Sequence, residues 1–192
     1  MFREDKATAS AVFFLNKLAV TQTDPFTLLK LMYAAERESL RANVMLLTGD
    51  VFVNMDMGPV MMHTYDCIKG TREGGPWSKH FKRMSKYVVR LIEPLDPAGI
   101  LTPGELELLE TAWNTAGPLL TAGGSFKEKV RRMHELFPEW KDPAPAKQSS
   151  LELPDIFHEG LSVEPDIAEA RSRLIANVEG VRKAAARYAQ SM

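Results

Sequence analysis

The residues that most constrain the fold of this chain are a group of turn formers in its first third. Gly49-Asp50 separates two short apolar runs, and this pattern predicts a tight β-hairpin with arms at 45–47 and 51–53. Further along, Gly58 permits backbone angles that are closed to other residues, and Pro59 suits the first position of a helix. We therefore expect a corner at Gly58, followed at once by a helix that begins at Pro59.

This segment contains no obvious nucleophile, general base or metal-binding cage. It therefore favours a binding protein over an enzyme. The whole chain has 192 residues, of which 45% are hydrophobic, and its net charge of −1 gives no general attraction to nucleic acid or membranes. No apolar stretch reaches the roughly 18 residues that a membrane helix needs. Cys67 is the only cysteine, which excludes an internal disulfide and fits a reducing compartment. We expect a cytoplasmic protein without a membrane partner.

Start signals predict the second helix, and composition predicts a strand further on. Asp24 caps a helix that has Pro25 at its first position and runs to about Asn43. The segment Lys86–Ile92 is rich in β-branched and aromatic residues. We expect this segment to join the hairpin in one small sheet.

Two capping boxes, each a Thr or Ser followed three residues later by Glu, open two later helices. The first box is Thr102 with Glu105, and the second is Ser125 with Glu128. Gly117-Pro118 is a typical stop signal, so the first of these helices should end there.

The expected fold class is mainly α with a small antiparallel sheet, an α+β fold. It consists of a compact helical domain with an inserted β-hairpin, at 1–140, and a C-terminal helical extension, at 151–192. Residues 141–150 contain two prolines and little that is apolar, and read as a Pro/Ser linker. The final helix should pack back on the body through the first three members of a heptad-like seam, Leu174, Val178, Val181, Ala185 and Tyr188.

His63 and Cys67 are four residues apart on a predicted helix, so they share a face and could supply two metal ligands. No third ligand has local support, and Cys67 lies in mid-helix, away from the N-terminus that favours a thiolate. We expect no metal, no cofactor and no catalysis. An uncharacterised enzyme that uses His63, Cys67 and nearby carboxylates remains an alternative.

A basic patch with interleaved aromatic residues follows, and it contains no acid from Gly74 to Ile92. It favours an acidic protein surface as its partner, while a nucleic-acid-binding regulator is a second alternative. Its cationic members are Lys79, Lys82, Arg83, Lys86 and Arg90.

Glu36 and Arg37 lie near the charged end of the second helix, just before the predicted hairpin. We expect one of the charges there to pair with Asp50 or Asp66, which makes this end of the helix a candidate interface.

Several short motifs occur in the order and spacing that resemble the Panacea domain family of antitoxins. This family is also called SocA-like, and it includes phage-associated GepA-type proteins. The resemblance covers about Phe14 to Trp140. It is carried by Leu29–Arg37, Thr48–Val53, Met57–Val60, Tyr65-Asp66 and Thr102–Glu107, and by the element from His134 through Pro138 to Trp140.

The resemblance implies a bacterial or phage antitoxin of a toxin–antitoxin system. Such a protein neutralises a cognate protein toxin by direct contact in a hetero-complex. A homo-oligomer is a further alternative. Together with the residues above, it gives the following candidate partner-binding residues: Glu36, Arg37, Thr48, Asp50, Met55, Met57, Gly58, Pro59, Tyr65, Asp66, Arg83 and Lys86.

Overall fold

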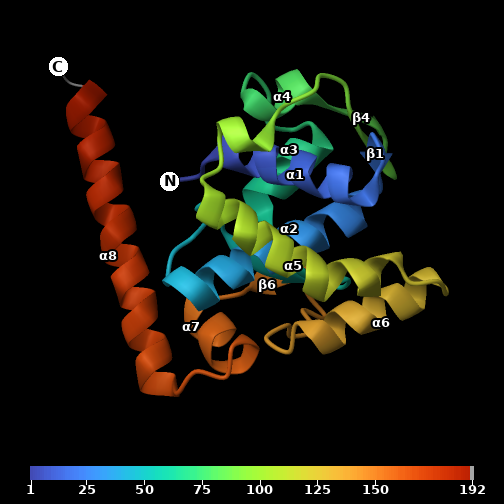
Figure 1. Cartoon of the computed structure of the whole chain (residues 1–192). Coiled ribbons are helices and arrows are strands. Elements are labelled where there is room, and N and C mark those ends of the chain that lie inside the picture. Colours follow the sequence, from blue (N-terminus) through green and yellow to red (C-terminus); the bar gives the residue numbers. More distant parts are fainter. Residues whose placement is uncertain (191–192) are drawn as a thin grey trace.

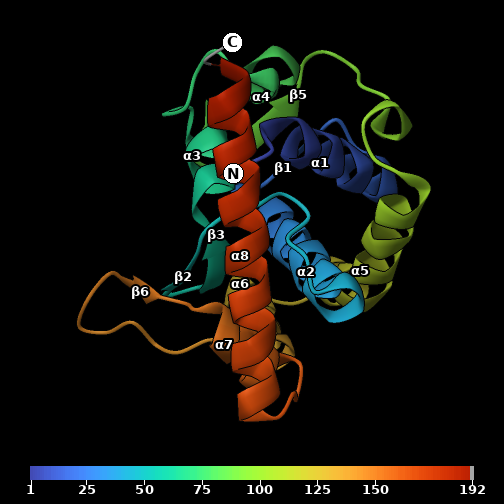
Figure 2. The same ribbon diagram turned by 90° about the vertical axis from the view of Figure 1, so that its left-hand side faces the viewer.

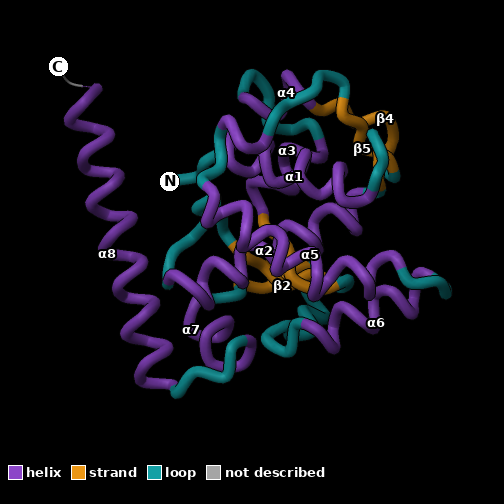
Figure 3. Tube along the Cα trace, in the orientation of Figure 1, coloured by secondary structure: helices purple, strands orange, loops and turns teal. Residues whose placement is uncertain are grey.

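The computed structural model describes residues 1–190, with side chains described for all of these except 185, 186 and 188–190. The fold is α+β and mainly helical, as the sequence predicts, with two three-stranded antiparallel sheets (Figure 1). Figure 3 shows the strands in two separate places, one group behind the central helices and one at the edge of the molecule. The expectation of a single small sheet is therefore wrong.

The central helix is α2 (Pro25–Asn43), against which α1 (Glu4–Leu18) and α5 (Pro103–Thr121) pack. Its predicted start is confirmed, since the Asp24 carboxylate accepts the Thr27 N–H at 2.8 Å. Every residue from Phe26 to Glu36 is buried. This burial takes the acidic and basic side chains Glu36 and Lys30 out of water.

The hairpin lies after the predicted one, in β2 (Phe52–Met55) and β3 (Gly58–Met61). Residues 45–51 form no strand, so the predicted first arm at 45–47 is wrong, while the predicted second arm at 51–53 overlaps the start of β2. The reason is that side chains satisfy the backbone there: the Glu36 carboxylate accepts the Thr48 N–H at 3.1 Å, and Asp50 accepts the Val51 N–H at 2.7 Å. A loop held in this way has little left to gain from a strand ladder.

Pro59 lies inside β3, opposite Asn54, and does not begin a helix. The third helix, α3 (Met62–Lys69), begins three residues later than expected. Proline is tolerated here because β3 is an edge strand in the order β3-β2-β6, so its missing N–H breaks no ladder bond. Gly58 does adopt the special backbone that the sequence predicts, with φ of +104°.

The predicted strand near residue 90 forms as β5 (Val88–Leu91), but it does not join the hairpin. It pairs with β4 (Phe81–Ser85) on one side and with the short β1 (Gln22–Thr23) on the other. The short helix α4 (Pro76–His80) leads into this sheet, and the turn η1 (Pro97–Gly99) follows it. Figure 2 shows β5 near α4 and well away from β2 and β3.

Both capping boxes are present, in α5 and in α6 (Phe126–Leu136). The predicted end of α5 at Gly117-Pro118 is wrong, because the helix continues through Pro118 to Thr121. Leu120 is buried on the last turn, and this packing holds the helix beyond the proline.

The segment after α6 packs against the body. Strand β6 (Gln148–Ser150) pairs with β2, and Figure 2 shows its loop projecting from one side. Two short helical segments follow it, α7 (Leu153–Asp155) and η2 (Ile156–Gly160), and Ile156 and Phe157 are buried there. The division of the chain into a domain at 1–140, a linker and an extension stays a prediction.

The last helix, α8 (Pro165–Gln190), runs along one side of the molecule and contacts α7 and η2 at its beginning (Figures 1 and 2). The predicted docking face is wrong, since Leu174, Val178 and Val181 are all exposed. Ala168 and Ile175 face the body in their place. The side chains of Ala185 and Tyr188, which complete the predicted seam, lie outside the described residues.

No helix within residues 1–190 is both long enough and apolar enough to cross a membrane.

Candidate functional site

A mostly apolar pocket of about 430 Å³ opens where the start of α2, the hairpin β2–β3, α3, the turn between β4 and β5, and the start of α6 meet. We call it the Lys30 pocket. Four predicted partner-binding residues line it, namely Met55, Met57, Tyr65 and Lys86. The other lining residues are Asp24, Pro25, Phe26, Leu29, Lys30, Val60, Tyr87 and Phe126.

Lys30 is the feature that distinguishes this pocket. Its side chain is 1% exposed, and its Nζ donates a hydrogen bond of 2.7 Å to the Pro59 carbonyl. Nζ also lies 5.4 Å from the centre of the Phe26 ring. Burial disfavours the ammonium and lowers the pKa of Lys30 to about 7.

The rim of the pocket presents large apolar side chains to solvent. Met57 is 46% exposed, Phe126 54% and Tyr87 66%. Met57 lies at the β2–β3 turn and Tyr87 at the β4–β5 turn, so segments distant in the sequence supply one surface. A hollow with exposed aromatic and methionine side chains at its edge is typical of a protein-binding surface.

Gly58 and Pro59 are buried and lie next to the Lys30 amine. A Cβ at Gly58 would lie 2.9 Å from the Lys30 Nζ, so the glycine leaves room for the lysine. His134 also lies near Gly58, and the Trp140 ring stacks on it with 3.6 Å between the ring centres, while the Trp140 indole N–H donates to the Met55 carbonyl at 2.8 Å. The motif around Gly58 and the one that ends at Trp140 therefore build one structure, although they are far apart in the chain.

Glu36, Thr48 and Asp50 form a second, buried cluster. The Glu36 carboxylate accepts hydrogen bonds from the N–H and the hydroxyl of Thr48, and it makes no ion pair within the described residues. Burial, with a smaller contribution from the nearby Asp50 charge, raises the pKa of Glu36 to about 8. Asp50 accepts the N–H groups of His63 and Thr64 and so caps α3. The expected pairing of Glu36 or Arg37 with Asp50 or Asp66 does not occur.

Arg37 is half-buried and holds the C-terminal part of the chain against α2. Its Nε lies 3.0 Å from a carboxylate oxygen of the buried Glu139, and its Nη groups donate to the carbonyls of Leu136 and Gly160. Tyr33 donates to the same Glu139 oxygen at 2.8 Å. Burial raises the pKa of Glu139, while the Arg37 charge opposes that shift. Glu36 and Arg37 are therefore placed as supports of the fold, away from the Lys30 pocket.

The cationic patch is exposed, with Lys79 in α4 and its other members on the β4–β5 hairpin. Lys82 and Arg90 are cross-strand partners there. Arg83 donates to the carbonyl oxygens of Ser85 and Lys69, and the Lys86 Nζ lies 4.7 Å from the Tyr87 ring centre. Of these residues, Lys86 is the one that reaches the Lys30 pocket.

His63 and Cys67 do share α3, but their side chains serve packing. The His63 ring lies 5.0 Å from the Phe2 ring, and Cys67 is buried, which raises the pKa of its thiol. Among the described residues, no three His, Cys, Asp or Glu side chains gather as a group that could hold a metal. Asp66 lies apart from the pocket and accepts a hydrogen bond from the Thr71 hydroxyl.

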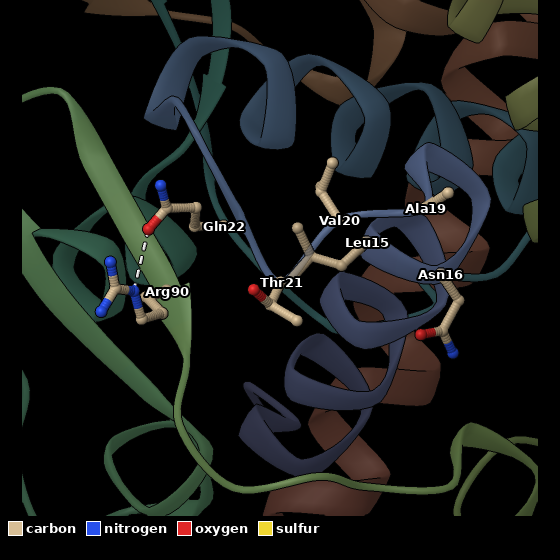
Figure 4. Close-up of a pocket in the computed structure, with 7 residues that line it drawn as sticks. All are labelled: Leu15, Asn16, Ala19, Val20, Thr21, Gln22 and Arg90. Carbon is tan, nitrogen blue, oxygen red and sulfur yellow. Dashed lines mark hydrogen bonds between the residues drawn. The ribbon is translucent and has the colours of Figure 1, made fainter.

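Another depression, of about 940 Å³, lies beside the end of α1 and β1. Figure 4 shows its side chains spread around an open space, with Arg90 donating a 2.8 Å hydrogen bond to Gln22 at one edge. Arg90 is its one charged lining residue, and it is exposed. This depression offers no buried polar group to a ligand.

Sequence reasoning missed Lys30, Phe26, Tyr87 and Phe126 as pocket residues. Phe126 and Tyr87 are separated from Lys30 by long stretches of chain, and no local pattern links them. A signal for Lys30 did exist, because it is a lone charge within the apolar run from Phe26 to Ala35.

The fold and the pocket define a mainly helical α+β protein with a mostly apolar hollow that is bordered by exposed Met57, Tyr87 and Phe126. A family model described as antitoxin SocA-like, Panacea domain, matches residues 28–141, which is more than half of the chain. The chain belongs to this family, and the resemblance found in its motifs is confirmed. No curated protein and no solved structure matches the chain.

Proposed function

We propose that this chain is the antitoxin of a toxin–antitoxin pair and that it neutralises a cognate toxin by direct protein–protein binding. The family to which the chain belongs supports an antitoxin role. The observation that carries direct binding is the Lys30 pocket, where five elements converge on one hollow bordered by exposed Met57, Tyr87 and Phe126.

The pocket suits a protein partner for a physical reason. Exposed apolar side chains cost free energy in water, and burying them against a partner recovers roughly 25 cal/mol for each Å² removed from water. Methionine adapts its shape, and Tyr87 offers both an apolar ring and a hydroxyl. Lys86 at the edge adds a positive charge that would steer an acidic surface into place.

The test is co-expression with the product of the adjacent gene. Growth should stop when that product is made alone, and it should recover when this chain is made with it. The two proteins should also co-purify in a stable complex. Recovery of growth without a complex would contradict neutralisation by direct binding, as would the absence of any toxicity to neutralise.

A further inference from the structure

We propose that the Lys30 pocket recognises a carboxylate that the partner protein carries beside an apolar side chain, and that Lys30 is the residue that binds this carboxylate. The inference rests on the proposed function, since it names the chemistry by which the toxin would enter the same pocket. The apolar side chain would fill the hollow, and the carboxylate would reach the Lys30 Nζ.

The first observation is that the Lys30 ammonium has more hydrogen-bond donors than it has partners among the described residues. An ammonium has three N–H donors, yet among the described residues the Lys30 Nζ has one hydrogen-bond acceptor, the Pro59 carbonyl. No carboxylate in the described part of the chain lies within ion-pairing distance of it. A buried cation is costly unless it is paired, so an unpaired lysine that lines a pocket favours an incoming anion.

The second observation is that the chain's own acid at this pocket is already occupied. Asp24 lines the pocket, but its two oxygens accept the N–H and the hydroxyl of Thr27 as the cap of α2. Lys86 adds a second cation at the edge. His134 lies near Lys30 from α6, and its pKa is lowered by burial first and by the Lys30 charge second. The charges around the pocket therefore favour a negative ligand group.

The third observation is the apolar wall around the amine, formed by Phe26, Leu29, Val60 and Met55. A charge-assisted hydrogen bond made where water is excluded is stronger than the same bond at an exposed surface. The volume of about 430 Å³ suits one or two side chains rather than a folded element. The geometry therefore fits an acidic residue with an apolar neighbour on a projecting segment of the partner.

The chemistry is tested first with a small probe, 4-phenylbutyrate, and its uncharged counterpart, 4-phenylbutanol, titrated into the full chain near pH 6 and followed by NMR. The carboxylate should bind at least tenfold more tightly than the alcohol. Lys30→Met should abolish this preference, and Lys147→Met, which removes an exposed loop lysine, should leave it intact. Equal affinities for acid and alcohol, or a preference that survives in a folded Lys30→Met protein, would overturn the inference.

A second readout needs no substitution, which guards against a variant that does not fold. The pKa of Lys30, followed through its Nζ signal, should rise when the carboxylate binds, and the affinity for 4-phenylbutyrate should fall between pH 6 and pH 8.5. The other titratable or charged groups facing Lys30 are Asp24, Tyr65, Lys86, Tyr87 and His134. His134→Gln should keep the pH dependence, because its imidazole is not the proposed anion-binding group. An unchanged Lys30 pKa on saturation would contradict the proposal.

Binding measurements with the toxin distinguish the antitoxin proposal from the carboxylate inference. If the toxin binds the wild-type chain and binds Lys30→Met at least tenfold more weakly, both claims are supported. If the toxin binds both proteins equally, the carboxylate inference is wrong and the antitoxin proposal stands. If no toxin binds the wild-type chain, the antitoxin proposal is wrong, and with it the claim that the carboxylate comes from a partner protein.

Discussion

The Tyr33 hydroxyl donates a 2.8 Å hydrogen bond to Glu139, a residue 106 positions away, and Arg37 lies 3.0 Å from the same carboxylate oxygen. This contact ties the central helix to the segment after α6, at a place where Glu139 has no exposure to water. Two residues of one helix thus contact the same buried glutamate, which is distant from them in the sequence.

Arg37→Met should therefore destabilise the fold strongly. It leaves the Glu139 carboxylate buried without its cation, and breaking a buried pair in this way costs about 3–5 kcal/mol. Arg37→Met combined with Glu139→Gln should recover part of this loss, because it removes the unpaired charge. Urea denaturation of the single and double variants checks both statements. A single variant within about 0.5 kcal/mol of the wild type would contradict the account.

Gly58→Ala should destabilise the chain more than Gly74→Ala does. Both glycines have positive φ, +104° and +80°, so each substitution strains the backbone by about 1–3 kcal/mol. At Gly58 the new Cβ also meets the Lys30 Nζ at 2.9 Å, whereas at Gly74 it meets nothing within 4 Å. Thermal unfolding of the two variants measures the difference. Equal losses would show that the contact with Lys30 is unimportant.

The stability of the chain should fall as the pH rises from about 5 to 7, because of Glu36. Its folded pKa is about 8 against 4.5 in the unfolded chain, so the folded state holds the extra proton in this window. The stabilisation is complete below the unfolded pKa and is lost as the pH passes through the folded one, by an amount of order several kcal/mol.

Lys30 has the opposite sign. Its folded pKa is about 7 against 10.5 unfolded, so the unfolded state binds more protons between these values and stability rises with pH there. Urea denaturation of Glu36→Gln isolates the first effect, since the amide cannot ionise. Its stability should lack the fall between pH 5 and 7 that the wild type shows. Parallel pH profiles of the two proteins would contradict the assignment to Glu36.

The attachment of α8 should depend on Ile175 and not on the exposed seam. Ile175 is 4% exposed and Val181 is 70% exposed. Ile175→Asp buries a charge and should release α8 from the body, so that limited proteolysis removes this helix faster than in the wild type. Val181→Asp should be cut at the wild-type rate. Faster cleavage of both variants, or of neither, would contradict the observed docking face.

The sequence predicts well those features that nearby residues decide. The Asp24 cap, both capping boxes and the special backbone at Gly58 each depend on a few neighbouring residues, and all are confirmed. Proline at position 59 suits both a helix start and an edge strand, and only the sheet order distinguishes the two.

Long-range contacts explain what the sequence did not predict. The local pattern of residues 45–51 predicts a hairpin, but Glu36 from another element accepts the Thr48 N–H, and the segment forms a loop. The seam of α8 has the spacing of a buried stripe, yet its residues are exposed. The buried residue Ile175 lies on the neighbouring face of the helix. The Lys30 pocket combines five elements, so no single motif could outline it, although four of the predicted contact residues line it.

The central claim, binding of a toxin at the Lys30 pocket, is tested most directly by the dissociation constant of the complex for two matched variants. Met57 and Met45 are both exposed methionines, at 46% and 41%, but Met57 lines the pocket and Met45 does not. Calorimetric titration with the adjacent gene product should show Met57→Glu binding at least tenfold more weakly than the wild type, with Met45→Glu unchanged. Equal affinities for the wild type and both variants would contradict the account.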